Sequence, residues 1–177
     1  DRRSRVVSKD EPVLLSGIST TGEKRYMTGV SEFDGVMGGG IVPGAVTLIG
    51  GDPGIGKSTL ALQIGCALSE KGEKVLYVSG EESVKQTHLR AQRLSAGKNK
   101  SVYIVNQLDL NAVIEYIEKM NPSIVVIDSI QVRYSSEISS SPGSVSQVRE
   151  CAAILTHLAK SKGIALFIIG HVTKDGM

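Results

Sequence analysis

Residues 51–58 read Gly-Asp-Pro-Gly-Ile-Gly-Lys-Ser, which matches the pattern Gly-x-x-x-x-Gly-Lys-Ser/Thr at every fixed position. The stretch follows an apolar run at 45–49 and opens an amphipathic run at 57–72, so it is expected to join a buried strand to a helix. Glycines let the backbone curl until several N–H groups point at one spot, and the positive end of the helix dipole falls there too. This pattern predicts a loop that binds the phosphates of a nucleoside triphosphate. The alternative is a glycine-rich turn that only joins a strand to a helix.

The residues of this phosphate loop have separate expected roles. Lys57 is expected to bridge the β- and γ-phosphates of ATP, and the Ser58 hydroxyl is expected to ligate Mg²⁺. Thr59, the next helical residue, is expected to contact the α-phosphate. The predicted nucleotide-binding residues are Gly51, Asp52, Pro53, Gly54, Ile55, Gly56, Lys57, Ser58 and Thr59.

Apolar and amphipathic runs alternate along the rest of the chain. Continuous apolar strands between amphipathic helices indicate a mostly parallel central sheet with helices on both faces, so the predicted fold is one α/β domain. The predicted strands are 45–49, 75–78, 102–105, 124–127 and 164–169. The predicted helices are 30–37, 57–72, 83–96, one capped by Asp109, and 144–162. The side chains aligned on one face of the helix at 83–96 are Val84, Thr87, Ala91 and Leu94.

An acidic residue ends the aliphatic run 124–127. Asp128 completes the pattern of a Walker B strand, and parallel sheets gather ligands at the carboxyl ends of their strands. Asp128 is therefore expected to hold Mg²⁺, partly through water, together with Ser58. The alternative is an aspartate that only caps the loop after a strand.

Glu81 and Glu82 follow the predicted strand 75–78. A carboxylate at this place is suited to orienting and deprotonating the water that attacks the γ-phosphate, and Glu81 is preferred for that catalytic role. The alternative is a solvated acidic turn at the start of the next helix, where negative charge is favourable.

His171 ends the last predicted strand and is the third catalytic candidate, beside Lys57 and Glu81. A polar side chain there is placed to sense the γ-phosphate and to relay its state to the following loop. A single histidine can equally have a purely structural role.

The composition excludes several classes of protein. Hydrophobic residues make up 41% of the chain and charged residues 21%, which excludes a disordered or collagen-like chain. The net charge of +2 is too balanced to indicate nucleic acid by itself. No apolar run reaches the ~20 residues of a membrane span and no secretory signal is present, so a cytoplasmic location without a membrane partner is expected. Cys66 and Cys151 lack the spacing of a zinc site and are expected to be buried thiols.

Other stretches are more distinctive than the phosphate loop. They read Tyr-Val-Ser-Gly-Glu-Glu-Ser at 77–83, Pro-Gly-Ser-Val-Ser-Gln-Val-Arg-Glu at 142–150 and Gly-His-Val-Thr-Lys at 170–174. With 28–34, 38–44, 51–58 and 128–131, they make the chain resemble bacterial RadA, also called Sms, a family of RecA-type ATPases.

The resemblance implies a RecA-like P-loop NTPase core and several functions. The implied strand order runs from 102–105 through 75–78, 124–127 and 164–169 to 45–49. The family forms hexameric rings that bind single-stranded DNA and use ATP to drive branch migration in recombination, and RecA is a further implied partner. Glu81 corresponds to the catalytic glutamate, and His171 corresponds to a sensor between the nucleotide and the second DNA loop.

The serine-rich segment between residues 131 and 146 corresponds to the first DNA-facing loop. Its serines, with Gln147 and Arg149, are expected to contact phosphates without reading bases. The alternative is an ordinary surface loop.

The chain also departs from the family pattern. Residues 1–28 are expected to be an extended lead-in, with a possible hairpin, and 29–177 the ATPase core. The N-terminal four-cysteine zinc finger, the Lys-Asn-Arg-Phe-Gly motif beyond the second DNA loop and the Lon-protease-like domain are missing, so zinc is expected only in the missing finger. The resemblance implies that the Lys-Asn-Arg-Phe-Gly motif supplies a basic group to the neighbouring subunit's nucleotide. This chain alone is therefore expected to bind ATP or ADP but to hydrolyse ATP weakly.

Three functions remain open. The first is an ATP-driven motor on single-stranded DNA. The second is a recombination scaffold whose assembly is switched by nucleotide. The third is a KaiC-like ATPase or kinase, since that family shares paired glutamates after its second strand.

Overall fold

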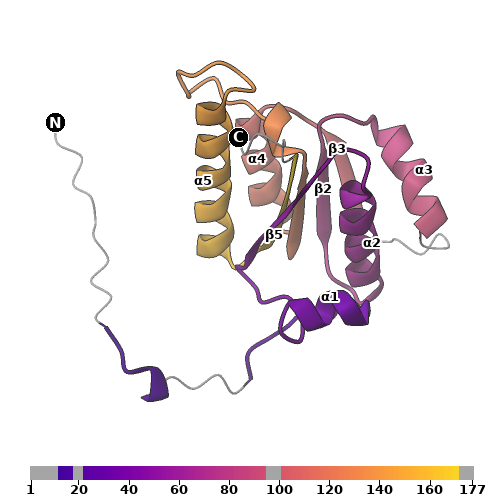
Figure 1. The fold of residues 1–177 in the computed structure, drawn as a ribbon, viewed down its shortest axis with the longest axis vertical. Coiled ribbons are helices and arrows are strands. Elements are labelled where there is room, and N and C mark those ends of the chain that lie inside the picture. Colours follow the sequence, from indigo (N-terminus) through magenta and orange to yellow (C-terminus); the bar gives the residue numbers. More distant parts are fainter. Residues whose placement is uncertain (1–11, 18–21, 95–100, 172–177) are drawn as a thin grey trace.

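The fold is built on a parallel sheet. The computed structural model describes residues 12–17, 22–94 and 101–171. Within these residues five parallel strands lie in the order β1-β5-β4-β2-β3, which is the order that the resemblance implied (Figure 1). The strands are β1 (Val46–Gly51), β2 (Val75–Ser79), β3 (Val102–Asn106), β4 (Ile124–Asp128) and β5 (Ala165–His171).

The central strands alternate their side chains between two apolar layers. In β2, Tyr77 faces one layer and Val78 faces the other, and in β4 the same holds for Val126 and Ile127. All five residues of β2 are buried, as expected of a continuous apolar run whose two faces are both covered.

Helices cover both faces of the sheet (Figure 1). The layer that contains Tyr77 is covered by α2 and α3, and the layer that contains Val78 is covered by α4 and α5. The predicted α/β fold is therefore confirmed. The helices are α1 (Ser31–Val36), α2 (Lys57–Glu70), α3 (Val84–Leu94), α4 (Leu110–Met120) and α5 (Val145–Lys162), and short 3-10 turns lie at η1 (Leu15–Gly17) and η2 (Ile130–Val132).

Local chemistry sets the helix ends. Asp109 caps α4 as predicted, because its carboxylate accepts a hydrogen bond from the backbone N–H of Asn111 at 2.9 Å. Ser144 caps α5 by accepting from the N–H of Gln147 at 3.2 Å. At the other end of α5, Gly163 takes the left-handed conformation with φ of 66°, which favours glycine.

Side-chain burial was only partly predictable from the sequence. Val84 was predicted to align with Thr87 and Ala91 on one face of α3, and along that face Val84 is 46% exposed whereas Thr87 and Ala91 are buried. Val84 lies in the first turn, and α3 meets the core only through its later turns. Both cysteines are buried, as predicted.

The lead-in to the core does not form a hairpin within its described residues. Tyr26 instead pairs with Ile41, beyond α1, in a single antiparallel bridge, and both side chains belong to the core. Residues 1–11 and 18–21 of the expected lead-in, residues 95–96 of the expected helix and residues 172–174 lie outside the described residues.

Candidate functional site

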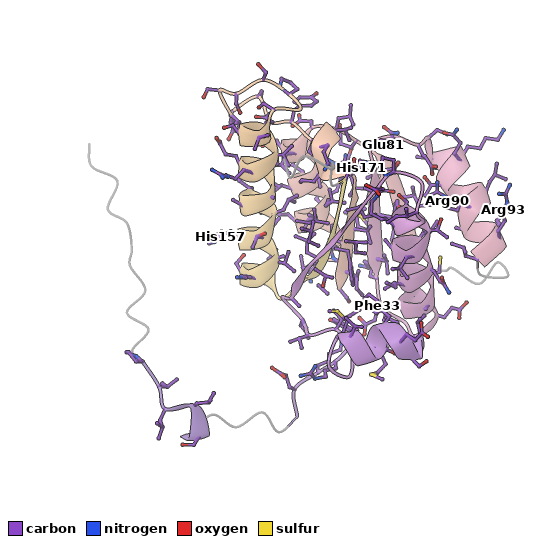
Figure 2. All side chains as sticks on the ribbon, viewed as in Figure 1. Phe33, Glu81, Arg90, Arg93, His157 and His171 are labelled. Atoms are coloured by element: carbon purple, nitrogen blue, oxygen red, sulfur yellow. The ribbon has the colours of Figure 1, made fainter. Side chains whose placement is uncertain are left out.

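The candidate site lies where the parallel strands end. The phosphate loop joins β1 to α2, Glu81 and Glu82 follow β2, Asp128 is the last residue of β4, and His171 is the last residue of β5. Because β1, β5, β4 and β2 are successive neighbours in a parallel sheet, their carboxyl ends meet at one edge. Figure 2 shows Glu81 and His171 together at that edge.

The phosphate loop is curled through glycines. Gly54 and Gly56 have φ of 81° and 97°, values that disfavour other residues. The helix α2 begins at Lys57, and no side chain among the described residues caps it at Gly56. The first N–H groups of α2 are therefore available to an anion, and the helix dipole favours negative charge there.

Lys57 lies against its own loop. Its side chain is only 6% exposed, and its ammonium group donates hydrogen bonds to the carbonyl oxygens of Gly51 at 2.8 Å and Asp52 at 2.7 Å. These contacts hold a positive charge beside the loop before any phosphate binds.

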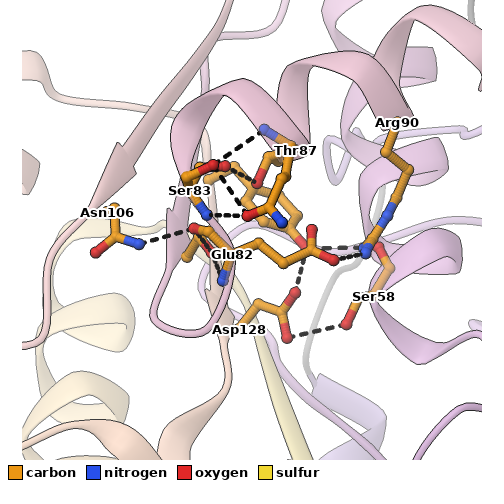
Figure 3. Close-up of polar contacts among 10 residues, drawn as sticks. Ser58, Glu82, Ser83, Thr87, Arg90, Asn106 and Asp128 are labelled. Atoms are coloured by element: carbon orange, nitrogen blue, oxygen red, sulfur yellow. Dashed lines mark hydrogen bonds and ion pairs between the residues drawn. The ribbon is translucent and has the colours of Figure 1, made fainter.

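Ser58 and Asp128 are brought together from positions 70 residues apart. The Ser58 hydroxyl donates to Asp128 Oδ1 at 3.0 Å, and the Tyr77 hydroxyl donates to Asp128 Oδ2 at 2.5 Å. Figure 3 shows Ser58 and Asp128 in contact. Burial, with the nearby Asp128 carboxylate, raises the pKa of Tyr77 far above its ordinary value, so Tyr77 stays a neutral donor. Tyr77 was not predicted as a site residue, because in the sequence it is one more member of an apolar strand.

Glu81 is held in place by Ser129, the residue that directly follows β4. The Ser129 hydroxyl donates to Glu81 Oε1 at 2.7 Å, and the same oxygen lies 3.4 Å from His171 Nε2. The hydrogen bond from Ser129, followed by that from His171, holds the pKa of Glu81 below its ordinary value of 4.5. The side chain of Glu81 is 52% exposed, so the charged carboxylate is accessible to solvent at neutral pH.

His171 connects Glu81 to the segment that follows β4. The backbone carbonyl of His171 accepts a hydrogen bond from Gln131 Nε2 at 3.2 Å. Its Nδ1 atom is buried and has no partner within the described residues.

Glu82 has a different position from Glu81. Its carboxylate forms an ion pair with Arg90 of α3 (Figure 3). The charge of Glu82 is thus balanced by Arg90, whereas Glu81 lines the cavity of the candidate site.

Part of the phosphate loop, Glu81, Arg90 and His171 line a cavity of about 320 Å³, within the size range of small-molecule sites, whereas Asp128 is not among the lining residues but contacts Ser58, which is one of them. Gly51 and Asp52 are outside the lining and instead hold Lys57, and Ile55 is 63% exposed. Arg90 is a lining residue that the sequence did not reveal. Its only local signal is its place between the core positions Thr87 and Ala91 of α3. The lining residues are Pro53, Gly54, Gly56, Lys57, Ser58, Thr59, Glu81, Arg90 and His171.

The serine-rich segment after β4 is partly folded back on the protein. Gln147 is 1% exposed, and its amide hydrogen-bonds with Ser135 and Ser140. The prediction that Gln147 contacts DNA phosphates was therefore wrong, because its polar atoms hold the segment against α5. Arg149 is exposed.

Several known proteins are similar in sequence to nearly the whole of this chain. A family model described as an AAA domain matches residues 15–177. DNA repair protein RadA of Bacillus subtilis is 54% identical over 97% of this chain and 37% of its own length. The RadA proteins of Listeria monocytogenes and Streptococcus pneumoniae are 52% and 49% identical over 96% and 95% of this chain, and 36% and 40% of their own lengths. This chain thus spans little more than a third of these relatives.

A solved structure shares the fold. A DnaB-like replicative helicase, described together with its interactions with primase, superposes with a TM-score of 0.70 at 18% identity, over 85% of this chain and 44% of that one. At this identity the likeness concerns the fold alone. Among the described residues, no helix is both long enough and apolar enough to span a bilayer.

Proposed function

Because the chain belongs to the family of bacterial RadA and has its RecA-like ATPase fold, we propose that it hydrolyses ATP to act on single-stranded DNA during recombination and repair. The convergence of Lys57, Ser58 and Glu81 on one cavity carries the proposal. Branch migration of recombination intermediates, a homohexameric ring and partnership with RecA are parts of this proposal that rest on the family, since the chain spans about 37% of the Bacillus relative.

Binding of the triphosphate is assigned to the phosphate loop. The uncapped N–H groups at the start of α2 and the ammonium group of Lys57 supply donors and positive charge at one place. Lys57 exchanges its contacts with the Gly51 and Asp52 carbonyls for phosphate oxygens when nucleotide binds.

The donor set fits Mg²⁺. Ser58 and Asp128 offer a hydroxyl and a carboxylate oxygen that are already 3.0 Å apart, and Mg²⁺ is typically held by one or two protein oxygens plus phosphates and waters. Among the described residues, no group of three or more His, Cys, Asp or Glu side chains is placed to hold a metal ion. Bound Mg²⁺ would neutralise charge on the phosphates.

Glu81 is assigned to the attacking water. Its lowered pKa keeps it ionised at neutral pH, and its exposed carboxylate is free to accept a hydrogen bond from water. His171, in contact with Glu81 and at the start of the next segment, is assigned the relay between the nucleotide and that segment.

The DNA-facing surface is assigned to the exposed part of the serine-rich segment. Ser136, Ser139 and Ser141 are exposed in that segment, and Arg149 is exposed in the first turns of α5 beside it. Hydroxyl and guanidinium groups suit phosphate contacts without base reading. The chain of 177 residues does not contain the Lys-Asn-Arg-Phe-Gly motif, and we expect slow hydrolysis by it alone.

A set of three variants tests the ATPase. Lys57→Ala is expected to abolish nucleotide binding, whereas Lys119→Ala, a matched change on an exposed lysine of α4, is expected to leave it unchanged. Glu81→Gln is expected to retain ATP but to lower kcat by roughly 10²–10⁴-fold. Equal nucleotide affinity in the Lys57→Ala and Lys119→Ala proteins would refute the site.

The same Glu81→Gln variant separates the competing functions. A motor loses branch migration while it still binds DNA, whereas a nucleotide-switched scaffold keeps most of its activity when locked with ATP. A KaiC-like kinase would instead transfer radiolabelled phosphate from ATP to itself, which we do not expect.

A further inference from the structure

Arg133 is a buried cation directly beneath the candidate site. Its side chain is 0% exposed, although burying an unpaired charge is very unfavourable. Its guanidinium donates hydrogen bonds to the carbonyl oxygens of Val78 at 2.9 Å and Asp128 at 3.0 Å, and also to that of Gln107. Burial lowers the pKa of Arg133 to about 10, which leaves it charged at neutral pH.

The carbonyl groups that Arg133 binds belong to the strand ends that carry the acids. Val78 is in β2, just before the turn to Glu81, and Asp128 ends β4. Gln107 follows β3. The planar guanidinium has donors in fixed directions, so it can hold several carbonyl groups at set positions relative to one another.

The turn before Glu81 packs on Arg133 and its neighbour. A Cβ atom added to Gly80 would lie 2.3 Å from Val132 Cγ2 and 3.1 Å from Arg133 Nη2, so only glycine fits without movement. The N–H of Gly80 also donates to the Asp128 carbonyl at 2.7 Å, so the turn and the end of β4 share one small network with Arg133.

We propose that Arg133 is a positioning residue that fixes Glu81 and Asp128 relative to each other and so sets the rate of hydrolysis without touching nucleotide. The inference rests on the proposed ATPase function. Arg133 directly follows η2 and lies near the start of the serine-rich segment, so its hydrogen bonds also tie that part of the segment to the strand ends that carry the two acids.

The test compares Arg133→Met, which removes the charge and the hydrogen bonds, with Arg133→Lys, which keeps the charge but loses the planar fork. Arg93→Met makes the same exchange at an exposed position of α3, whose side chain points away from the cavity (Figure 2). Each change is made in a full-length protein that carries this core. Thermal unfolding, binding of a fluorescent ADP with and without Mg²⁺, kcat and KM are measured.

A positioning role predicts that kcat falls while the affinity for Mg²⁺-free ADP stays nearly unchanged. Arg133→Met is expected to lower kcat by roughly 10- to 100-fold, as small displacements of catalytic groups do, with Mg²⁺-free ADP affinity within about threefold of wild type. A higher Mg²⁺ concentration is expected for half-maximal tightening of ADP binding, because Asp128 is displaced. Arg133→Lys should fall between Arg133→Met and wild type, and Arg93→Met should match wild type.

Two results overturn the proposal. One is a folded Arg133→Met protein with unchanged kcat and Mg²⁺ dependence, and the other is a parallel loss of ADP affinity, kcat and stability, which marks a merely structural role. If Arg133→Met does not fold, Gly80→Ala replaces it in the test, because its methyl group displaces Val132 and Arg133 from the turn. Gly80→Ala should then lower kcat while Mg²⁺-free ADP affinity stays near that of wild type. Wild-type kinetics in this variant would overturn the proposal. Equal ADP binding by wild type and Lys57→Ala would overturn the ATPase function itself, and the role of Arg133 with it.

Discussion

The hydroxyl group of Tyr77 is predicted to stabilise the protein through Asp128. Tyr77→Phe removes the hydroxyl that donates to Asp128 Oδ2 at 2.5 Å and leaves the ring, which is 1% exposed, in its place in the core. The exchange creates no large cavity, so the main loss is that of the hydrogen bond to the charged Asp128, about 1.5–3 kcal/mol, together with a longer contact with the Ser58 carbonyl at 3.4 Å. For a chain of this length such a loss lowers Tm by roughly 3–12 °C.

Chemical denaturation measures this loss directly. The chain contains no tryptophan, so unfolding in urea is followed by far-ultraviolet circular dichroism. Tyr103→Phe makes the same exchange at a side chain that is 48% exposed, and it is expected to change the free energy of unfolding by less than about 0.5 kcal/mol. If Tyr77→Phe were as stable as Tyr103→Phe, the hydrogen bond to Asp128 would contribute nothing and the reasoning would be refuted.

Three further predictions concern the same site and the segment beside it. The hydrogen bond from the Ser129 hydroxyl lowers the pKa of Glu81 below 4.5, so its contribution to the free energy of unfolding is present above that pH and is lost as pH falls through the folded-state pKa. Ser129→Ala should therefore be less stable than wild type at neutral pH, and the difference measured by urea denaturation should shrink in acid. A difference that stays constant with pH would exclude this cause. Removal of Mg²⁺ by a chelator should weaken ADP binding by wild type but not by Asp128→Asn, so equal Mg²⁺ dependence in calorimetric titrations of the two proteins would remove Asp128 from the metal site. Gln147→Ala leaves its partner groups on Ser135 and Ser140 unpaired, which costs about 1–3 kcal/mol. Amide hydrogen exchange should therefore accelerate at 135–144, while ADP affinity stays unchanged. Unchanged exchange would mean that Gln147 does not hold the segment in place.

The strands and helices could be read from the sequence because their signals are local. The runs at 75–78 and 124–127, which form most of β2 and β4, are continuously apolar, and Asp109 and Gly163 mark helix ends by their own side-chain and backbone chemistry. The order of the strands came from the family resemblance, since strand order depends on pairings between distant segments that periodicity does not encode. The exposure of Val84 in the first turn of α3 was not predictable for the same reason, because it depends on where the sheet lies.

The candidate site was predictable where residue type and spacing carry the chemistry, as in the phosphate loop. The residues that hold the predicted groups in place could not be found this way. Arg90 and Arg133 read as ordinary basic residues, and Tyr77 reads as a core aromatic, until the fold brings each to a carboxylate or a set of carbonyl groups. For Gln147 the prediction was wrong in the opposite sense. This polar residue, next to an exposed loop in the sequence, belongs to a buried hydrogen-bond network in the structure.

The amides of residues 51–59, with Lys57 and Ser58, are expected to bind a magnesium-bound triphosphate. A crystal structure of the chain with a non-hydrolysable ATP analogue and Mg²⁺ tests it most directly. We predict phosphate oxygens against the start of α2 and Lys57, with the metal ion between the phosphates, Ser58 and Asp128. Analogue bound elsewhere, with the phosphate loop unchanged and Lys57 still hydrogen-bonded to the Gly51 and Asp52 carbonyls, would show that residues 51–59 are not the triphosphate site.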